Sequence, residues 1–233
     1  MAFFKSPQPN ALPVQVADRA HGLQIEPIWF EWVALGGLLA FGSWLLGMRG
    51  VWALLLSSDP TGITLVIIVL FFASTLWCGA RSRELQHQRR LLADTREGRG
   101  HEGWAADYLA ALRARPVDDN APLDLLVEAT QGPHHTAWWV NGIQLKLGLL
   151  GKVIGFSVLA LQIGNIQSFD ASQSQDLLKS LTQGLGIALL TTMVGLVGNI
   201  LLGLQLTRLD RFADQIVADC QRLGLAVRAT TKD

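Results

Sequence analysis

The sequence predicts an all-α membrane protein with four transmembrane helices and helical extensions into the cytoplasm. Half of its 233 residues are hydrophobic and only 16% are charged, against about 25% in a soluble domain. The hydrophobic residues gather in four blocks, each long enough to cross a bilayer, which takes about 20 residues of helix. The formal net charge is zero, so no long-range attraction to nucleic acid is expected.

The four blocks are expected to span the bilayer as helices. They cover residues 28–48, about 61–80, about 143–164 and about 184–206. Trp29, Phe30 and Trp32 open the first block, as expected of an aromatic belt at the membrane surface. The first 27 residues are polar and include prolines, which disfavours a signal peptide because a signal peptide needs an apolar core.

Lys and Arg set the expected orientation, because short cytoplasmic loops are enriched in them. The segment 81–142 carries eight arginines, and the tail after residue 206 carries four arginines and Lys232. The connections on the other side of the membrane carry only Arg49 and Lys179. We therefore expect both termini and the segment 81–142 to be cytoplasmic.

The spans divide the chain into alternating cytoplasmic and membrane segments. Within the segment between the second and third spans we expect a continuation of the second span, an amphipathic helix at "EGWAADYLAALRAR", and a helix at "PLDLLVEATQ", where Pro122 suits a first turn. The tail should be an amphipathic helix that runs on from the fourth span. The predicted segments are a cytoplasmic N-terminal segment 1–27, a transmembrane hairpin 28–80, a cytoplasmic helical segment 81–142, a second hairpin 143–206 and a cytoplasmic C-terminal helix 207–233.

Motifs for covalent or hydrolytic chemistry are absent from the sequence, which contains no P-loop, GxSxG, HExxH or CxxC. His134 and His135 are adjacent, but no third metal ligand stands at a useful spacing, so we interpret them as histidines at the membrane interface. Cys78 and Cys220 are interpreted as free thiols. We expect no enzyme, no metal and no cofactor.

The fourth span carries a stripe of small and polar residues. Counting in steps of three and four, Gly184, Ala188, Thr192, Gly195 and Asn199 share one helix face, with Thr191 and Gly198 beside it, and leucines and valines take the opposite face. Such a stripe serves close helix packing in membranes, or it lines a pore. The third span has a matching edge of Gly148, Gly151 and Gly155, with Lys152 next to it.

Acidic residues are nearly absent from the spans. Glu31, near the edge of the first span, is the one Asp or Glu in the four blocks. A proton path through a bilayer usually needs a titratable group inside it. If this protein conducts protons by a carboxylate, that carboxylate belongs to another chain.

Two short runs resemble the MotA/TolQ/ExbB proton-channel family. They are "GLLGKVIG" at 148–155 and "ALLTTMVGLV" at 188–197. In this family, too, two such runs follow each other in this order, after a large cytoplasmic segment. The resemblance covers about residues 138–214 in sequence. The number of spans, four, is similar to the MotA branch, whereas the residues of the two motifs are closer to those of TolQ and ExbB.

The resemblance implies a function as well as a fold. This chain would be the A-type subunit, or stator, of an ion-driven rotary motor in the bacterial inner membrane. Five copies would surround two single-span MotB/TolR/ExbD-like B subunits, each with a membrane aspartate, and H⁺ or Na⁺ flow would drive rotation. Thr192 falls on the family's last-span threonine and would lie on the pore wall, with Thr191, Asn199 and Lys152 along the ion pathway. The glycines of the third span, with Gly184, Ala188 and Gly195, would pack the helices or form the pore wall.

Two departures from the family pattern bear on conduction. A glutamate that TolQ and ExbB carry in the last span falls on Ile187, and the penultimate-span threonine falls on Lys152. Lys152 could pair with the B-subunit aspartate, be neutral through desolvation, or extend toward the cytoplasm. The alternatives to a motor are a non-conducting four-span scaffold with the same fold and a small-solute transporter, although no inverted repeat or broken helix supports the transporter.

Overall fold

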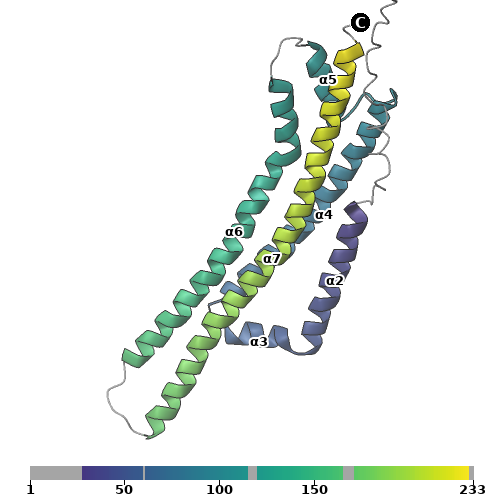
Figure 1. The fold of residues 1–233 in the computed structure, drawn as a ribbon. Helices are drawn as coiled ribbons and strands as arrows, with labels where there is room; N and C mark the ends of the chain where they lie inside the picture. Colours follow the sequence, from purple (N-terminus) through teal and green to yellow (C-terminus); the bar gives the residue numbers. More distant parts are fainter. Residues whose placement is uncertain (1–27, 60, 115–119, 165–170, 231–233) are drawn as a thin grey trace, which may run out of the picture.

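The computed structural model describes residues 28–59, 61–114, 120–164 and 171–230, and these fold into helices with no strand among them. The predicted N-terminal segment 1–27 lies outside the described residues. The elements are α2 (Ile28–Met48), α3 (Val51–Ser58), α4 (Ile63–Arg96), α5 (Trp104–Ala114), α6 (Ala121–Gly164) and α7 (Ala171–Thr230), arranged as an elongated bundle (Figure 1). The all-α prediction is confirmed.

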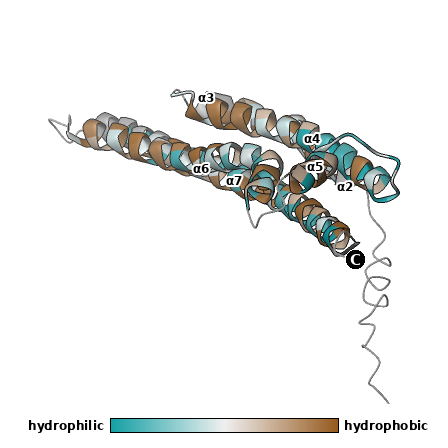
Figure 2. Cartoon of the chain, turned by 90° about the horizontal axis from the view of Figure 1, so that it is seen from above, coloured by the Kyte–Doolittle hydropathy of each residue, from teal (hydrophilic) through white to brown (hydrophobic). Residues whose placement is uncertain are grey.

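Four of these helices are long and apolar enough to cross a membrane, as predicted: α2, α4, α6 and α7. The short helices α3 and α5 lie toward opposite ends of the bundle, which we call the α3 end and the α5 end (Figure 1). Figure 2 shows hydrophilic colour where α4 passes α5, and mostly apolar or neutral colour along the other half of α6 and α7. The protein is therefore a membrane protein whose apolar half lies toward the α3 end.

Three helices continue well beyond the length that a bilayer needs. α4 runs on to Arg96, as predicted, and α7 runs without a break for 60 residues through the predicted fourth span and tail. α5 matches the predicted amphipathic helix. The third span and the helix expected before it form one helix of 44 residues, α6, which passes through Pro133 and bends in its part nearer the α5 end (Figure 1).

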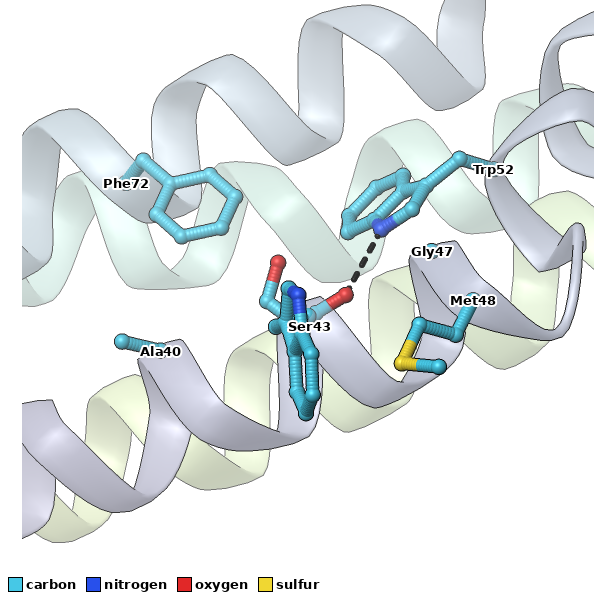
Figure 3. A pocket seen from close by; sticks show the side chains of 7 residues that line it. Ala40, Ser43, Gly47, Met48, Trp52 and Phe72 are labelled. Carbon is cyan, nitrogen blue, oxygen red and sulfur yellow. Dashed lines mark hydrogen bonds between the residues drawn. The ribbon is translucent and has the colours of Figure 1, made fainter.

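α3 was not predicted, because a helix of eight residues is too short for a span. The indole N–H of Trp52 donates to the carbonyl of Ser43 at 2.9 Å and ties α3 back to α2, beside a shallow hollow that Phe72 of α4 also lines (Figure 3). Asp59 then starts α4, because its carboxylate accepts the backbone N–H of Thr64 at 2.7 Å and that of Thr61 at 2.9 Å. Thr64 lies in the first turn of α4, where a backbone N–H has no helical carbonyl to bond.

The core lies mainly toward the α5 end, between α4, α6 and α7. Its largest buried side chains include Leu85 of α4 and Leu202, Leu206 and Ile216 of α7. α2 attaches to this group through Trp32, whose ring covers Gly79 of α4 so closely that a Cβ at residue 79 would lie 2.3 Å from it. The described part of the apolar half buries fewer large side chains and depends on close backbone contact between α6 and α7.

Candidate functional site

The contact between α6 and α7 in the apolar half is built from glycines, and we call it the α6–α7 seam. A Cβ on Gly155 would lie 2.8 Å from the backbone N of Ala188 and 2.8 Å from the carbonyl oxygen of Gly184. A Cβ on Gly148 would lie 3.1 Å from the Thr191 carbonyl oxygen. Small residues let membrane helices approach this closely, so the predicted small edges of the third and fourth spans face each other within one chain.

The buried stripe of α7 follows a heptad-like spacing. Gly184, Ala188, Thr191, Gly195 and Gly198 are buried against α6. Steps of four, three, four and three keep one face of α7 toward a partner helix. Thr191 and Gly198, which the sequence placed beside the stripe, are thus at its centre, whereas Thr192 and Asn199 lie at its edge and are half-buried.

The hydroxyl groups of both threonines in the seam donate hydrogen bonds to backbone carbonyls. Thr191 is fully buried and donates to the Ile187 carbonyl at 2.8 Å. Thr192 donates to the Ala188 carbonyl at 2.7 Å and lies 3.2 Å from the Gly148 carbonyl of α6. The Thr192 hydroxyl therefore links the two helices, and its oxygen keeps the capacity to accept a hydrogen bond or to contact a cation.

Lys152 lies outside the seam, although its neighbour Gly151 lies within it. Its side chain is exposed on the outer face of α6, with Nζ 5.9 Å from the centroid of the Phe156 ring. Phe156 is one turn farther toward the α3 end, so the ammonium is not directed toward the α5 end in this structure. Ile187, at the position where TolQ and ExbB carry a glutamate, is buried.

Amide side chains continue the seam toward the α5 end, and sequence reasoning named Asn199 among them but missed the others. Gln144 and Asn141 of α6 are buried, and Asn199 of α7 donates to the Asn141 carbonyl at 2.9 Å. Gln205 of α7 lies 3.3 Å from the hydroxyl of Thr75 on α4. The signal was present in the sequence, because Asn141 and Gln144 share the helix face of the seam glycines at steps of three and four.

A charged cluster closes this polar face where α4, α6 and α7 meet, and sequence reasoning missed it too. His134 has only 2% of its surface exposed, and its Nδ1 lies 2.7 Å from Oδ1 of Asp210 on α7. Trp138 donates its indole N–H to the other oxygen of Asp210 at 2.8 Å. Arg81 of α4 lies on the opposite side of the His134 ring, with Nε 3.4 Å from Nε2.

His134 is therefore a buried member of a polar cluster, which differs from the predicted interfacial histidine, whereas His135 is exposed. Burial lowers the pKa of His134, and Arg81 acts in the same direction, although the hydrogen bond to Asp210 opposes both. These contacts fit a neutral imidazole with its proton on Nδ1 facing the carboxylate, because Nε2 then offers a lone pair to the Arg81 N–H. No three metal-ligating side chains come together in the described part of the chain.

Comparison with known proteins adds no relative: no protein-family model, no curated protein and no solved structure matches this chain.

Proposed function

We propose that this chain is the A-type subunit of a MotA/TolQ/ExbB-like rotary motor, which conducts H⁺ or Na⁺ through a pentameric ring of this chain. The ring surrounds two single-span B subunits, each with a membrane aspartate, in the inner membrane of a bacterium. The α5 end and both termini are cytoplasmic, in agreement with the arginine distribution. The ion-motive force turns the ring around the B subunits.

The observation that carries this proposal is the tight seam between the third and fourth spans. It fixes the two helices as one rigid pair and holds Thr191 and Thr192 within the apolar half. The outward faces of the same pair stay apolar and exposed, for example at Val153, Phe156 and Met193. In a ring, such faces would contact neighbouring copies, the B subunits or lipid.

Lys152 supplies the charge that this arrangement needs to engage a B subunit. Its ammonium lies on an outer, apolar face of α6, where a bare charge in a bilayer is costly unless an opposite charge is near. The described spans provide no carboxylate beside it. A B-subunit aspartate is the matching partner, and a cation next to it would lower the pKa of that carboxyl group.

The test is the mass and ion flux of the purified chain. We expect a mass of five copies in detergent, and two more single-span chains when a B subunit is coexpressed. Ion flux into liposomes should require both subunits. A monomer or dimer in detergent would refute the motor.

A non-conducting scaffold is the second candidate, because both seam threonines already bond backbone carbonyls and Lys152 replaces a threonine typical of the family. Lys152→Thr separates the two functions, with Lys146→Thr on the same helix as the matched control. Flux that appears only in Lys152→Thr would identify Lys152 as a plug and favour the scaffold. Flux in the natural protein, reduced by Lys152→Thr and kept by Lys146→Thr, would support the motor.

A further inference from the structure

Pro133 interrupts the hydrogen bonds of α6 in the part of the helix that precedes the third span. A proline has no N–H, so the carbonyl four residues earlier loses its helical donor. That carbonyl belongs to Ala129. A buried or half-buried carbonyl without a donor is costly, so another group is expected to bond it.

Arg81 of α4 is that group. Its Nη2 donates to the Ala129 carbonyl at 3.0 Å and to the Thr130 carbonyl at 2.8 Å. The guanidinium also lies 5.3 Å from the Trp104 ring centroid of α5, which holds it from the other side. Arg81 thereby bridges α4 and α5 to the turn of α6 that Pro133 leaves incomplete, and we call these contacts the arginine clamp.

His134 sits beside the arginine clamp and shares the same guanidinium. In its neutral form Nε2 has a lone pair that accepts from Arg81 Nε, while Nδ1–H donates to Asp210. A proton added to the ring can attach only at Nε2, since Nδ1 is already protonated. Nε2–H and Nε–H would then be two donors facing each other, on two cations 3.4 Å apart.

We propose that His134 is a proton-binding site and that proton binding releases the arginine clamp from the proline turn of α6. The added proton strengthens the contact between His134 and Asp210, so α6 stays attached to α7. Arg81 withdraws toward solvent, and the Ala129 carbonyl loses its donor. The α6 segment between Ala121 and Pro133 then separates from α4, about a hinge at Pro133.

The surrounding charges are consistent with this order of events. From α7, Asp210 faces His134, and from α4, Arg81 faces it. Glu84 is a negative charge near Arg81, and the Cys78 thiol lies near Asp210. On α6 itself His135 follows, and α5 contributes the uncharged Trp104. Added charge on His134 is attracted by the Asp210 carboxylate and repelled by the Arg81 guanidinium. The contact with Arg81 is therefore the first to change.

The sign of the pH dependence follows from burial. Burial lowers the pKa of His134 below its ordinary 6.5, so the clamp should be closed at neutral pH and should open only below about pH 6.5. The inference concerns the junction at the α5 end and does not depend on ion conduction through the spans.

The experiment measures the distance between α4 and α6 by double electron–electron resonance of the full chain in lipid nanodiscs. Spin labels at the exposed positions His87 and Leu125 report the separation, and labelled chains are diluted into unlabelled ones to isolate distances within one chain. Cys78 and Cys220 are buried, and burial raises the pKa of the Cys220 thiol to about 12, so labelling favours the introduced cysteines.

We expect a longer, broader distance distribution on going from pH 8 to pH 5, with a midpoint below 6.5. His134→Gln retains an acceptor for Arg81 but cannot be protonated, so its distribution should stay at the pH 8 form throughout. His135→Gln, the matched control, should keep the full response. A pH response that persists in His134→Gln, or no response in the unaltered chain, would overturn the proposal.

A second measurement observes the unaltered chain, and the His134→Gln variant serves only to assign one signal. Nitrogen-15 spectra of the histidine rings should show His134 as the neutral Nδ1–H form at pH 8, assigned by its disappearance in His134→Gln. An Nε2–H form at pH 8 would mean that Arg81 and His134 already face each other as donors, and this would also overturn the proposal.

Discussion

The alanine substitution of Gly155 tests the α6–α7 seam most directly. The added Cβ would lie 2.8 Å from the Ala188 backbone nitrogen and from the Gly184 carbonyl oxygen. Ordinary contact begins at 3.4 Å, so the two helices must separate by about 0.6 Å at this point. Neither neighbour is the end of a flexible side chain, so the strain is expected to spread along both backbones.

The cost follows from the behaviour of overpacked cores. Extra methyl groups in a tightly packed site typically destabilise by about 1–3 kcal/mol. Alanine also favours a helix over glycine by about 0.5–1 kcal/mol, which offsets part of the loss. Gly142→Ala on the same helix isolates this second contribution, because a Cβ there meets no atom within 4 Å.

The assay is thermal unfolding of both variants in the same detergent, followed by intrinsic fluorescence. A change of 1 kcal/mol shifts Tm by about 2–4 °C for a chain of this size. Gly155→Ala should therefore melt about 2–12 °C below Gly142→Ala, and Gly142→Ala at or slightly above the unaltered protein. Equal melting temperatures for the two variants would show that α6 and α7 do not touch at Gly155, and the seam would have to be abandoned.

Three further substitutions test other parts of the structure. Thr192→Val removes the hydroxyl near the Gly148 carbonyl and should reduce ion-driven activity more than Leu190→Val on the other face; equal losses in a flux assay would refute the face assignment. Gly79→Ala places a Cβ 2.3 Å from the Trp32 ring, so α2 should detach and tryptophan emission should change, whereas Gly37→Ala, with an open position, should change neither. Asp59→Ala should destabilise the start of α4 by about 0.5–2 kcal/mol. Burial raises the pKa of Asp59, but hydrogen bonds from Thr61 and Thr64 outweigh it and hold the pKa below 3.8. The stability that the Asp59 carboxylate gives to α4 should therefore be lost as the pH falls through that lowered pKa. A circular-dichroism acid titration in which Asp59→Ala loses helix at the same pH as the unaltered chain would contradict the role of the carboxylate.

The helices were predictable because hydrophobic length and period are local properties of the sequence. The four spans, the continuation of α4 and α7, and α5 all follow from such patterns. The helix expected before the third span is continuous with that span through Pro133, and Arg81, 48 residues away from Ala129 in sequence, supplies the donor that Pro133 lacks. Local rules for proline cannot include a guanidinium from another helix.

The small residues of the α6–α7 seam were predictable from the sequence, but the contact that they make was not. Glycines at steps of three and four mark a close approach, yet they do not say whether the approach is to another helix of the same chain or to a pore. The polar cluster was harder, since Arg81, His134 and Asp210 are far apart in sequence and each resembles an ordinary residue at a membrane boundary. A search for polar residues that continue the small-residue face of α6 would have found His134, Asn141 and Gln144.

The buried residues of α7 change in size along the helix, and α6 bends as it follows this face (Figure 1). Apart from Ile187, the buried residues from Gly184 to Gly198 are small, whereas those from Leu202 to Ile216 are mostly large. Helices packed on small residues lie closer than helices packed on large ones, so a straight α6 cannot follow both halves of α7. α6 must change direction after the seam, and helix bends of this kind are commonly found at proline. The same proline exposes the Ala129 carbonyl, and Arg81 bonds it beside His134. The bend that the change in residue size requires is thus held by a contact that one proton on His134 can break.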